Sequence, residues 1–159
     1  MVINMGLYLR KADFKDCDVL FNWANDDEVR KNSFNQNKIL YGDHIVWFNK
    51  VMNSSKYMIF ILFSGSIPLG QVRIKIENGT AVISYSIDKK YRGKHLAFRM
   101  LALLENEVIN SKPNISKLVG YVKLDNNISQ KVFQNLNYNE VLHRDFYEYC
   151  KLLSNEVGI

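Results

Sequence analysis

Three consecutive strand patterns in the middle of the chain constrain its fold more than any other feature. Residues 57–63 form an uninterrupted apolar run of strand length, which is typical of a strand buried on both faces. Residues 68–76 follow a short turn and alternate apolar and polar side chains toward their end. Asn78 and Gly79 then form a strong hairpin-turn signal before a further strand at residues 81–87. The sequence therefore predicts three successive strands, of which the last two form a hairpin.

Helices and further strands flank these three on both sides. Apolar side chains at helical spacing predict helices at residues 43–52, 96–108 and 126–136, and a shorter helix around Trp23. Four more strands are predicted at residues 7–10, 118–122, 138–143 and 146–152. No linker, repeat or low-complexity tract interrupts this order. We therefore expect one α/β (α+β) domain over residues 1–159, with a mixed, mostly antiparallel sheet of about seven strands and about four helices.

The composition excludes several classes of protein. The chain has 159 residues, of which 47% are hydrophobic and 23% charged, so it can bury enough surface to fold without a disulfide or a metal. Cys17 and Cys150 lie far apart and belong to no Cys/His cluster, so we expect no metal site and two reduced, inert thiols. The sequence shows no signal peptide and no apolar run of about 20 residues, which predicts a cytoplasmic protein without a membrane partner.

The charge is concentrated in the loop that follows residues 81–87. The net charge is +5, and Lys89, Lys90, Arg92 and Lys94 contribute to it just before a predicted helix. A helix N-terminus offers unpaired N–H groups, and Gly93 allows a tight turn, so this loop suits a phosphate or pyrophosphate. An ordinary solvated basic turn is the alternative. Because the basic residues do not form a long stripe with interleaved aromatic residues, we expect no nucleic-acid partner.

The loop resembles the acyl-CoA pyrophosphate loop of the GNAT-family N-acetyltransferases, whose pattern is Gln/Arg-x-x-Gly-x-Gly/Ala. Arg92 and Ala97 match the pattern, whereas His95 replaces the usual glycine. The resemblance implies a GNAT-like domain that uses acetyl-CoA, with a backbone N–H near Ile87 polarising the thioester. It also implies that the donor loop binds the pyrophosphate through Arg92, Gly93, Lys94, His95, Leu96 and Ala97.

A second segment supports the same family. Residues 126–138 resemble the family's Asn-x-x-Ala/Ser helix, in which the residue at Asn126 bonds the pantetheine arm. Asn126, Ser129 and Phe133 are thereby expected to line the acetyl-CoA site. The family often places a tyrosine at position 133 to protonate the departing thiolate. Phe133 cannot donate a proton, so another group must do so or the thiolate leaves unaided.

The N-terminal half is similar to one subgroup of this family. Residues 23–30 and 43–48 resemble enzymes that acetylate nucleotide-linked deoxy-amino sugars in pseudaminic-acid and related glycan pathways. The implied acceptor is a UDP-linked 4-amino-4,6-dideoxy sugar. The predicted acceptor contacts are Asn32, Ser33, Phe34 and Tyr147. For Phe34, a side chain that is tucked inward is an equal alternative to a contact with a sugar or a uracil ring.

Two side chains are candidates for proton transfer. His44 lies among aromatic residues on a predicted helix where GNAT acceptors approach, so it is a candidate base; a structural hydrogen bond is the alternative. Tyr85 lies beside the expected thioester and is a candidate acid, or else part of the core or pocket wall. Trp23 and Trp47 are expected to be core residues.

Other functions remain open from the sequence alone. A protein N-terminus or an aminoglycoside is an alternative acceptor, which an acidic acceptor pocket would favour and a basic one would disfavour. A non-catalytic acyl-CoA sensor is an alternative of another class, suggested by His95 and Phe133. A homodimer is compatible with the sequence.

Overall fold

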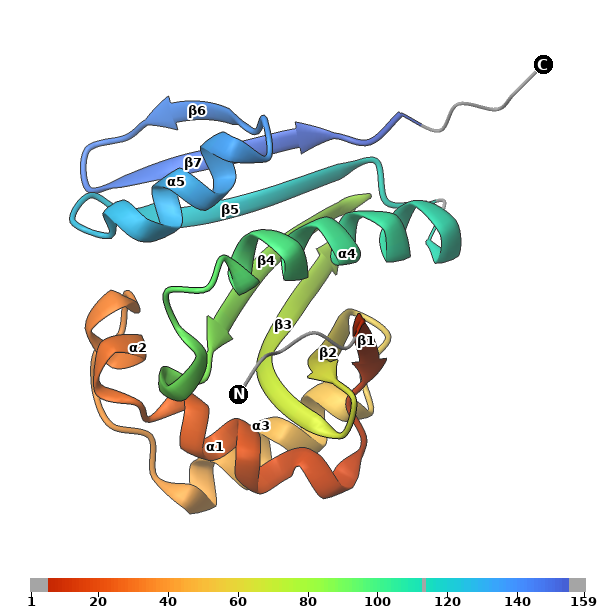
Figure 1. The fold of residues 1–159 in the computed structure, drawn as a ribbon, viewed down its shortest axis with the longest axis vertical. Helices are drawn as coiled ribbons and strands as arrows, with labels where there is room; N and C mark the ends of the chain where they lie inside the picture. Colours follow the sequence, from red (N-terminus) through yellow and green to blue (C-terminus); the bar gives the residue numbers. More distant parts are fainter. Residues whose placement is uncertain (1–5, 113, 155–159) are drawn as a thin grey trace.

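The computed structural model describes residues 6–112 and 114–154, which build one seven-stranded sheet of order β1-β2-β3-β4-β5-β7-β6 (Figure 1). The strands are β1 (Leu7–Lys11), β2 (Tyr57–Ser64), β3 (Ile67–Glu77), β4 (Thr80–Ile87), β5 (Lys117–Lys123), β6 (Asn139–Leu142) and β7 (Phe146–Leu152). The pair β4–β5 is parallel, and the other neighbouring pairs are antiparallel. The predicted mixed, mostly antiparallel seven-stranded sheet is therefore confirmed.

Five α-helices pack on this sheet in the part of the chain that the structure describes, one more than the sequence predicted. They are α1 (Cys17–Ala24), α2 (Asp27–Asn32), α3 (Tyr41–Met52), α4 (Leu96–Ser111) and α5 (Asn127–Asn135). The additional helix is α2. It forms because the Asp26 carboxylate accepts the backbone N–H groups of Glu28 and Val29, which caps the new helix directly after α1 ends.

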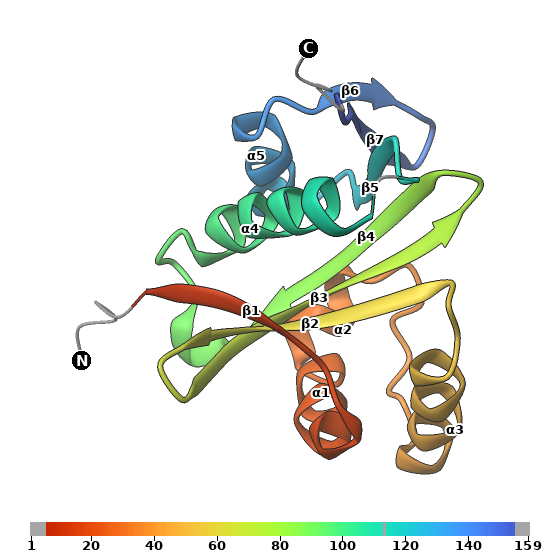
Figure 2. The same cartoon turned by 90° about the vertical axis from the view of Figure 1, so that its right-hand side faces the viewer.

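The helices divide between the two faces of the sheet. Figure 2 shows α4 and α5 on one side and α1, α2 and α3 on the other. Under α4 and α5 lies the larger apolar core, which includes Met100, Leu104 and Phe133. A smaller core, which includes Leu20 and Phe48, lies between α1, α3 and strand β2. None of the helices among residues 6–112 and 114–154 has the length and apolar character that a bilayer crossing needs.

Strands β4 and β5 run together for only part of their length. Their parallel pairing covers Thr80 to Ile83 on β4 and Lys117 to Gly120 on β5, after which the two strands diverge (Figure 1). Residues that pair across β3 and β4 share a face, so Val72 and Tyr85 face α4 and α5 while Arg73 and Ser84 face α1–α3. The divergence thus opens a passage between the two faces of the sheet.

Candidate active site

A cavity of about 1240 Å³ lies where β4 and β5 part. This volume exceeds the roughly 300–1000 Å³ of ordinary small-molecule pockets, so it has room for two substrates. The structure brings most of the predicted site residues together in its wall: Asn32, Ser33, Phe34, His44, Tyr85, Ile87, Arg92, Gly93, His95, Leu96, Ala97, Asn126, Ser129 and Phe133. Two predicted residues, Lys94 and Tyr147, are not part of the wall.

The loop before α4 has the backbone shape of an anion site. Gly93 has φ 78° and His95 has φ 57°, which places both in the left-handed region. His95 is also the N-cap residue of α4, and its side chain makes no capping hydrogen bond. The first N–H groups of α4 therefore stay free for an anion. A non-glycine residue in this conformation costs roughly 1–2 kcal/mol, which explains why a glycine is common at this point of the motif.

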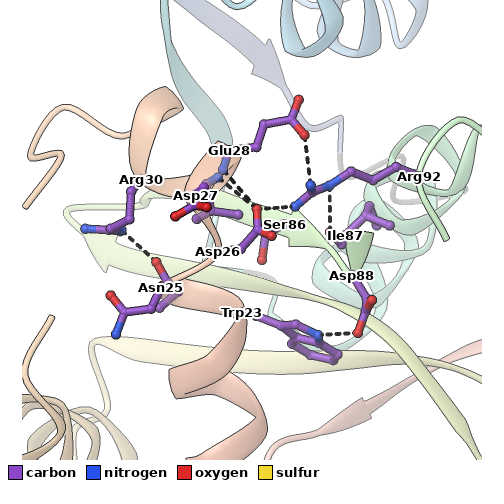
Figure 3. A network of polar contacts seen from close by, with 12 residues as sticks. Trp23, Asn25, Asp26, Asp27, Glu28, Arg30, Ser86, Ile87, Asp88 and Arg92 are labelled. Atoms are coloured by element: carbon purple, nitrogen blue, oxygen red, sulfur yellow. Dashed lines mark hydrogen bonds and ion pairs between the residues drawn. The ribbon is translucent and has the colours of Figure 1, made fainter. Parts of the chain in front are cut away.

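The Arg92 side chain forms ion pairs with two carboxylates of the chain. Its guanidinium donates to Asp26 Oδ1 at 2.6 Å and to Glu28 Oε2 at 2.8 Å, and its Nε donates to the Ile87 carbonyl at 3.2 Å (Figure 3). Burial alone would raise the pKa of Asp26, but the hydrogen bond from Arg92 and two backbone N–H groups lower it overall. The side chain is thus engaged with α2 and β4, and the expected contact of this loop with the donor, which runs through backbone N–H groups, stays a prediction.

The Lys94 side chain points away from the cavity, and the expected contact of this residue with the donor stays a prediction. Its side chain is exposed outside the cavity wall, with Nζ 5.8 Å from the centroid of the Tyr91 ring.

Helix α5 contributes a short hydrogen-bonded chain to the other side of the passage. Asn126 Oδ1 accepts the backbone N–H of Ser129 at 3.2 Å, which caps α5. The Ser129 Oγ lies 2.8 Å from the Tyr85 hydroxyl. Burial raises the pKa of Tyr85 to about 12 even though the Ser129 hydrogen bond opposes the shift. Tyr85 therefore stays protonated at neutral pH and keeps a proton that it can donate.

Phe133 belongs mainly to the core. Its side chain is 1% exposed and stacks on Tyr149 with ring centroids 5.1 Å apart. The tip of the ring lies so close to Gly120 on β5 that a Cβ at that glycine would come within 2.3 Å of Cζ. Phe133 therefore packs in the core beneath the cavity, and its ring also belongs to the cavity wall.

His44 lies at the base of the acceptor side. The residue is 2% exposed, and its ring packs on Phe48 and Trp47. Its Nε2 lies 2.9 Å from the carbonyl oxygen of Cys17. Because that carbonyl only accepts, Nε2 carries the hydrogen, and a base at His44 would have to act through Nδ1.

Two arginines that the sequence analysis did not identify give the acceptor side its charge. The Arg73 guanidinium carbon stands 4.9 Å from the Trp47 ring centroid, and burial lowers the pKa of Arg73 with a further contribution from Arg30. Arg30 donates to the Ala24 and Asn35 carbonyls, and burial lowers its pKa too. Among residues 6–112 and 114–154, neither arginine forms an ion pair with a carboxylate.

The segment after α2 covers the mouth of the cavity. Phe34 is 60% exposed and meets the Phe146 ring edge-to-face at 6.0 Å, so it is not tucked inward. Tyr147, expected as an acceptor contact, does not line the cavity. It pairs with Val122 on β5 and therefore lies on the face of the sheet that packs under α5. Tyr121, one residue before Val122, faces the cavity in its place.

Comparisons with known proteins agree with this geometry. The sequence profile of the Acetyltransferase (GNAT) domain matches residues 6–139. No curated protein sequence matches the chain. Among solved structures, a Vibrio cholerae spermidine N-acetyltransferase in complex with CoA and spermine is similar with a TM-score of 0.84 and 16% identity, covering 92% of this chain and 95% of that one.

Two further structures are similar. The RimL ribosomal-protein alpha-N-acetyltransferase in complex with CoA has a TM-score of 0.81 and 15% identity, covering 96% of this chain and 97% of that one. A domain from Methanocaldococcus jannaschii has a TM-score of 0.79 and 19% identity, covering 94% of this chain and 100% of that one. The profile match spans most of the chain, and the free N–H groups before α4 suit the pyrophosphate of a CoA thioester. The chain therefore belongs to the GNAT acetyltransferase family and is an acetyl-CoA-dependent N-acetyltransferase.

Proposed function

We propose that the protein acetylates the amine of a UDP-linked 4-amino-4,6-dideoxy sugar. The observation that carries this proposal is the unpaired guanidinium of Arg73 in the acceptor half of the cavity, with Arg30 nearby. The Arg73 residue is half-buried, and a cation partly removed from water without a counter-ion is costly unless a ligand supplies the negative charge. The diphosphate of a nucleotide sugar supplies it, and the Trp47 ring beside Arg73 offers an apolar surface to a planar base.

The same charges argue against a polycationic acceptor. Glu28 is the one carboxylate in the described cavity wall, and the Arg92 guanidinium neutralises it at 2.8 Å. A polyamine or an aminoglycoside brings several positive charges and needs free carboxylates to hold them. Beside Arg73 and Arg30, such an acceptor would instead meet like charge.

We propose direct transfer without a covalent enzyme intermediate. The neutral amine nitrogen bonds to the acetyl carbon, the carbon–sulfur bond breaks, and CoA leaves as a thiolate that takes up a proton. The amine gives up one proton in the same reaction. The cavity contributes by holding the two substrates together. Tyr85, which stays protonated, is our candidate for donating a hydrogen bond to the departing sulfur.

A thiol-release assay with acetyl-CoA tests the acceptor. The panel contains UDP-linked 4-amino-4,6-dideoxy sugars, spermidine, an aminoglycoside and short peptides with free N-termini. We expect release with the UDP-sugars alone. Release with a peptide, spermidine or the aminoglycoside would overturn the acceptor proposal while leaving the donor unchanged. Tight acetyl-CoA binding without release on any amine would favour the acyl-CoA sensor.

A further inference from the structure

Arg92 joins two parts of the molecule that face different substrates. The residue belongs to the donor loop, whose N–H groups suit the pyrophosphate of CoA. Its two ion-pair partners, Asp26 and Glu28, belong to the start of α2, which lines the acceptor half of the cavity. Its third contact is the carbonyl of Ile87 at the end of β4. One guanidinium thus connects the donor loop, the central sheet and the acceptor wall (Figure 3).

Helix α2 is held by polar contacts: besides the Arg92 ion pairs, Arg30 donates to the Ala24 carbonyl and Lys38 pairs with Asp27. It is six residues long and contains no buried residue, so it has no apolar core of its own. A helix of this length does not persist without tertiary contacts. Its other described polar contacts beyond the neighbouring loop include Lys123 Nζ, which donates to the Lys31 carbonyl at 2.9 Å. Because the Arg92 side chain is 29% exposed and that of Asp26 17% exposed, solvent screens this ion pair only in part.

A second hydrogen bond, from Trp23 to Asp88, also links helix α1 to the start of the donor loop. The Trp23 indole on α1 donates from Nε1 to Asp88 Oδ2 at 2.9 Å, and the other Asp88 oxygen accepts the Lys90 N–H. Asp88 also donates its backbone N–H to the Leu69 carbonyl on β3. The Trp23–Asp88 bond holds the stem of the donor loop against α1, which leaves the tip of the loop, where Arg92 lies, to act on α2.

We propose that Arg92 is a positioning residue that couples donor binding to the acceptor wall. When acetyl-CoA occupies the N–H groups at residues 93–97, it immobilises the loop, and Arg92 transmits that order to α2 through Asp26 and Glu28. Acceptor binding and donor binding then strengthen each other by the same factor, as thermodynamic linkage requires. The effect on α2 can be measured with acetyl-CoA alone, so the test of this role does not depend on which amine is acetylated.

Hydrogen exchange of the α2 amides, with and without saturating acetyl-CoA, tests the coupling. The variants are Arg92→Gln and the double variant Asp26→Asn/Glu28→Gln. The amide oxygen of asparagine can still cap α2, so the double variant removes charge without removing the cap. Arg99→Gln is the matched control, because Arg99 is an exposed arginine next to the same loop that forms no ion pair among the described residues.

In the wild type and in Arg99→Gln, we expect acetyl-CoA to slow exchange in α2 by about tenfold. In both test variants this protection should be lost, while the Kd for acetyl-CoA, measured by titration calorimetry, stays within about threefold of the wild-type value. Protection that persists in either test variant would overturn the proposal. A Kd raised by more than about tenfold in Arg92→Gln alone would also overturn it, because Arg92 would then be a phosphate ligand.

Discussion

The Tyr85 hydroxyl and the Ser129 hydroxyl lie 2.8 Å apart and join β4 to α5 at the place where β4 and β5 separate. The Tyr85 ring contacts the Phe133 ring in the core, and Tyr85 also lines the cavity. Its raised pKa follows from this burial. A neutral hydroxyl at this point is available to the departing thiolate throughout the physiological pH range.

Tyr85→Phe should therefore lower kcat by about tenfold, the modest effect expected when the leaving group is already a good one. The KM for acetyl-CoA should change by less than about threefold, because the phenyl ring keeps the packing. The shape of the pH–rate profile should stay the same, since Tyr85 does not titrate within it. Steady-state kinetics of Tyr85→Phe beside Tyr121→Phe, another tyrosine of the wall, would check this. An equal loss in both variants would contradict a specific role for Tyr85.

Alkaline pH should destabilise the fold through the same residue. The pKa of Tyr85 rises from its ordinary value of 10.0 to about 12 in the folded state. The stabilising contribution of its protonated form is complete below pH 10 and is lost as the pH rises toward 12, because the unfolded chain releases the proton first. Burial also raises the pKa values of Tyr138 and Tyr149, which adds to the effect.

Urea unfolding at about pH 9 and about pH 11 measures this linkage. The wild type should lose more free energy of unfolding between these pH values than Tyr85→Phe does, by about 1 kcal/mol, which is half of the full effect of a shift from 10.0 to about 12. An identical loss in the two proteins would show that Tyr85 titrates in the folded state as it does in the unfolded chain.

Gly120→Ala should be strongly destabilising. The new Cβ would lie 2.3 Å from Cζ of Phe133, which is itself buried and stacked on Tyr149. Overpacking of this kind costs about 1–3 kcal/mol or more. Gly42→Ala is the matched control, because no atom lies within 4 Å of its Cβ position and it lies in α3. Because alanine has a higher helix propensity than glycine, this substitution should stabilise the protein by up to about 1 kcal/mol. Thermal unfolding that ranks the two variants in the reverse order would contradict this packing.

The sheet could be predicted because its strands carry their own signals, whereas much of the site could not. Short turns such as Asn78–Gly79 are local features, so the antiparallel order β2-β3-β4 follows from them, whereas the β1–β2 pair joins segments that three helices separate in the chain. Helix α2 was not counted among the four predicted helices because it has no apolar face and is held by Asp26 and Arg92. The direction of the Arg92 side chain depends on this contact, 66 residues apart in the chain, which no local pattern contains.

Arg73 and Tyr147 are two residues whose position in the sheet could not be predicted from the local sequence. Arg73 looked like the solvent face of an alternating strand, although it lies on the third of seven strands and faces a cavity. The available signal was its position between two neighbouring strands, since a central strand has little access to solvent. Tyr147 was expected at the acceptor, but its face is set by pairing with Val122, and that register depends on the complete sheet.

His44→Gln should leave the pH–rate profile of kcat unchanged while lowering stability. The imidazole is buried against Phe48, and its Nε2–H is engaged by the Cys17 carbonyl. Losing this packing and hydrogen bond should cost about 1–3 kcal/mol. Kinetics from about pH 6 to pH 9, combined with thermal unfolding, separate the two roles. Disappearance of the acidic limb in His44→Gln would establish His44 as the base, acting through Nδ1.

Arg73→Gln tests the charge of the acceptor half. If Arg73 binds an anionic group, its loss should raise the KM for a UDP-linked amino sugar by about tenfold or more, as for a lost charge-assisted hydrogen bond. The Kd for acetyl-CoA should stay unchanged, because the donor loop lies on the other part of the cavity wall. Lys75→Gln is the control: Lys75 is two residues further along the same strand and face, but exposed beside the Tyr57 ring.

The result discriminates between acceptor classes because the sign of the effect depends on the acceptor's charge. With an anionic acceptor, Arg73→Gln raises the KM and Lys75→Gln does not. With a polycationic acceptor, Arg73 opposes binding, so its removal would lower the KM and overturn the proposed function. Added salt separates the two further, since it should raise the KM of the wild type and have a smaller effect on Arg73→Gln if attraction to an anion is what this arginine supplies.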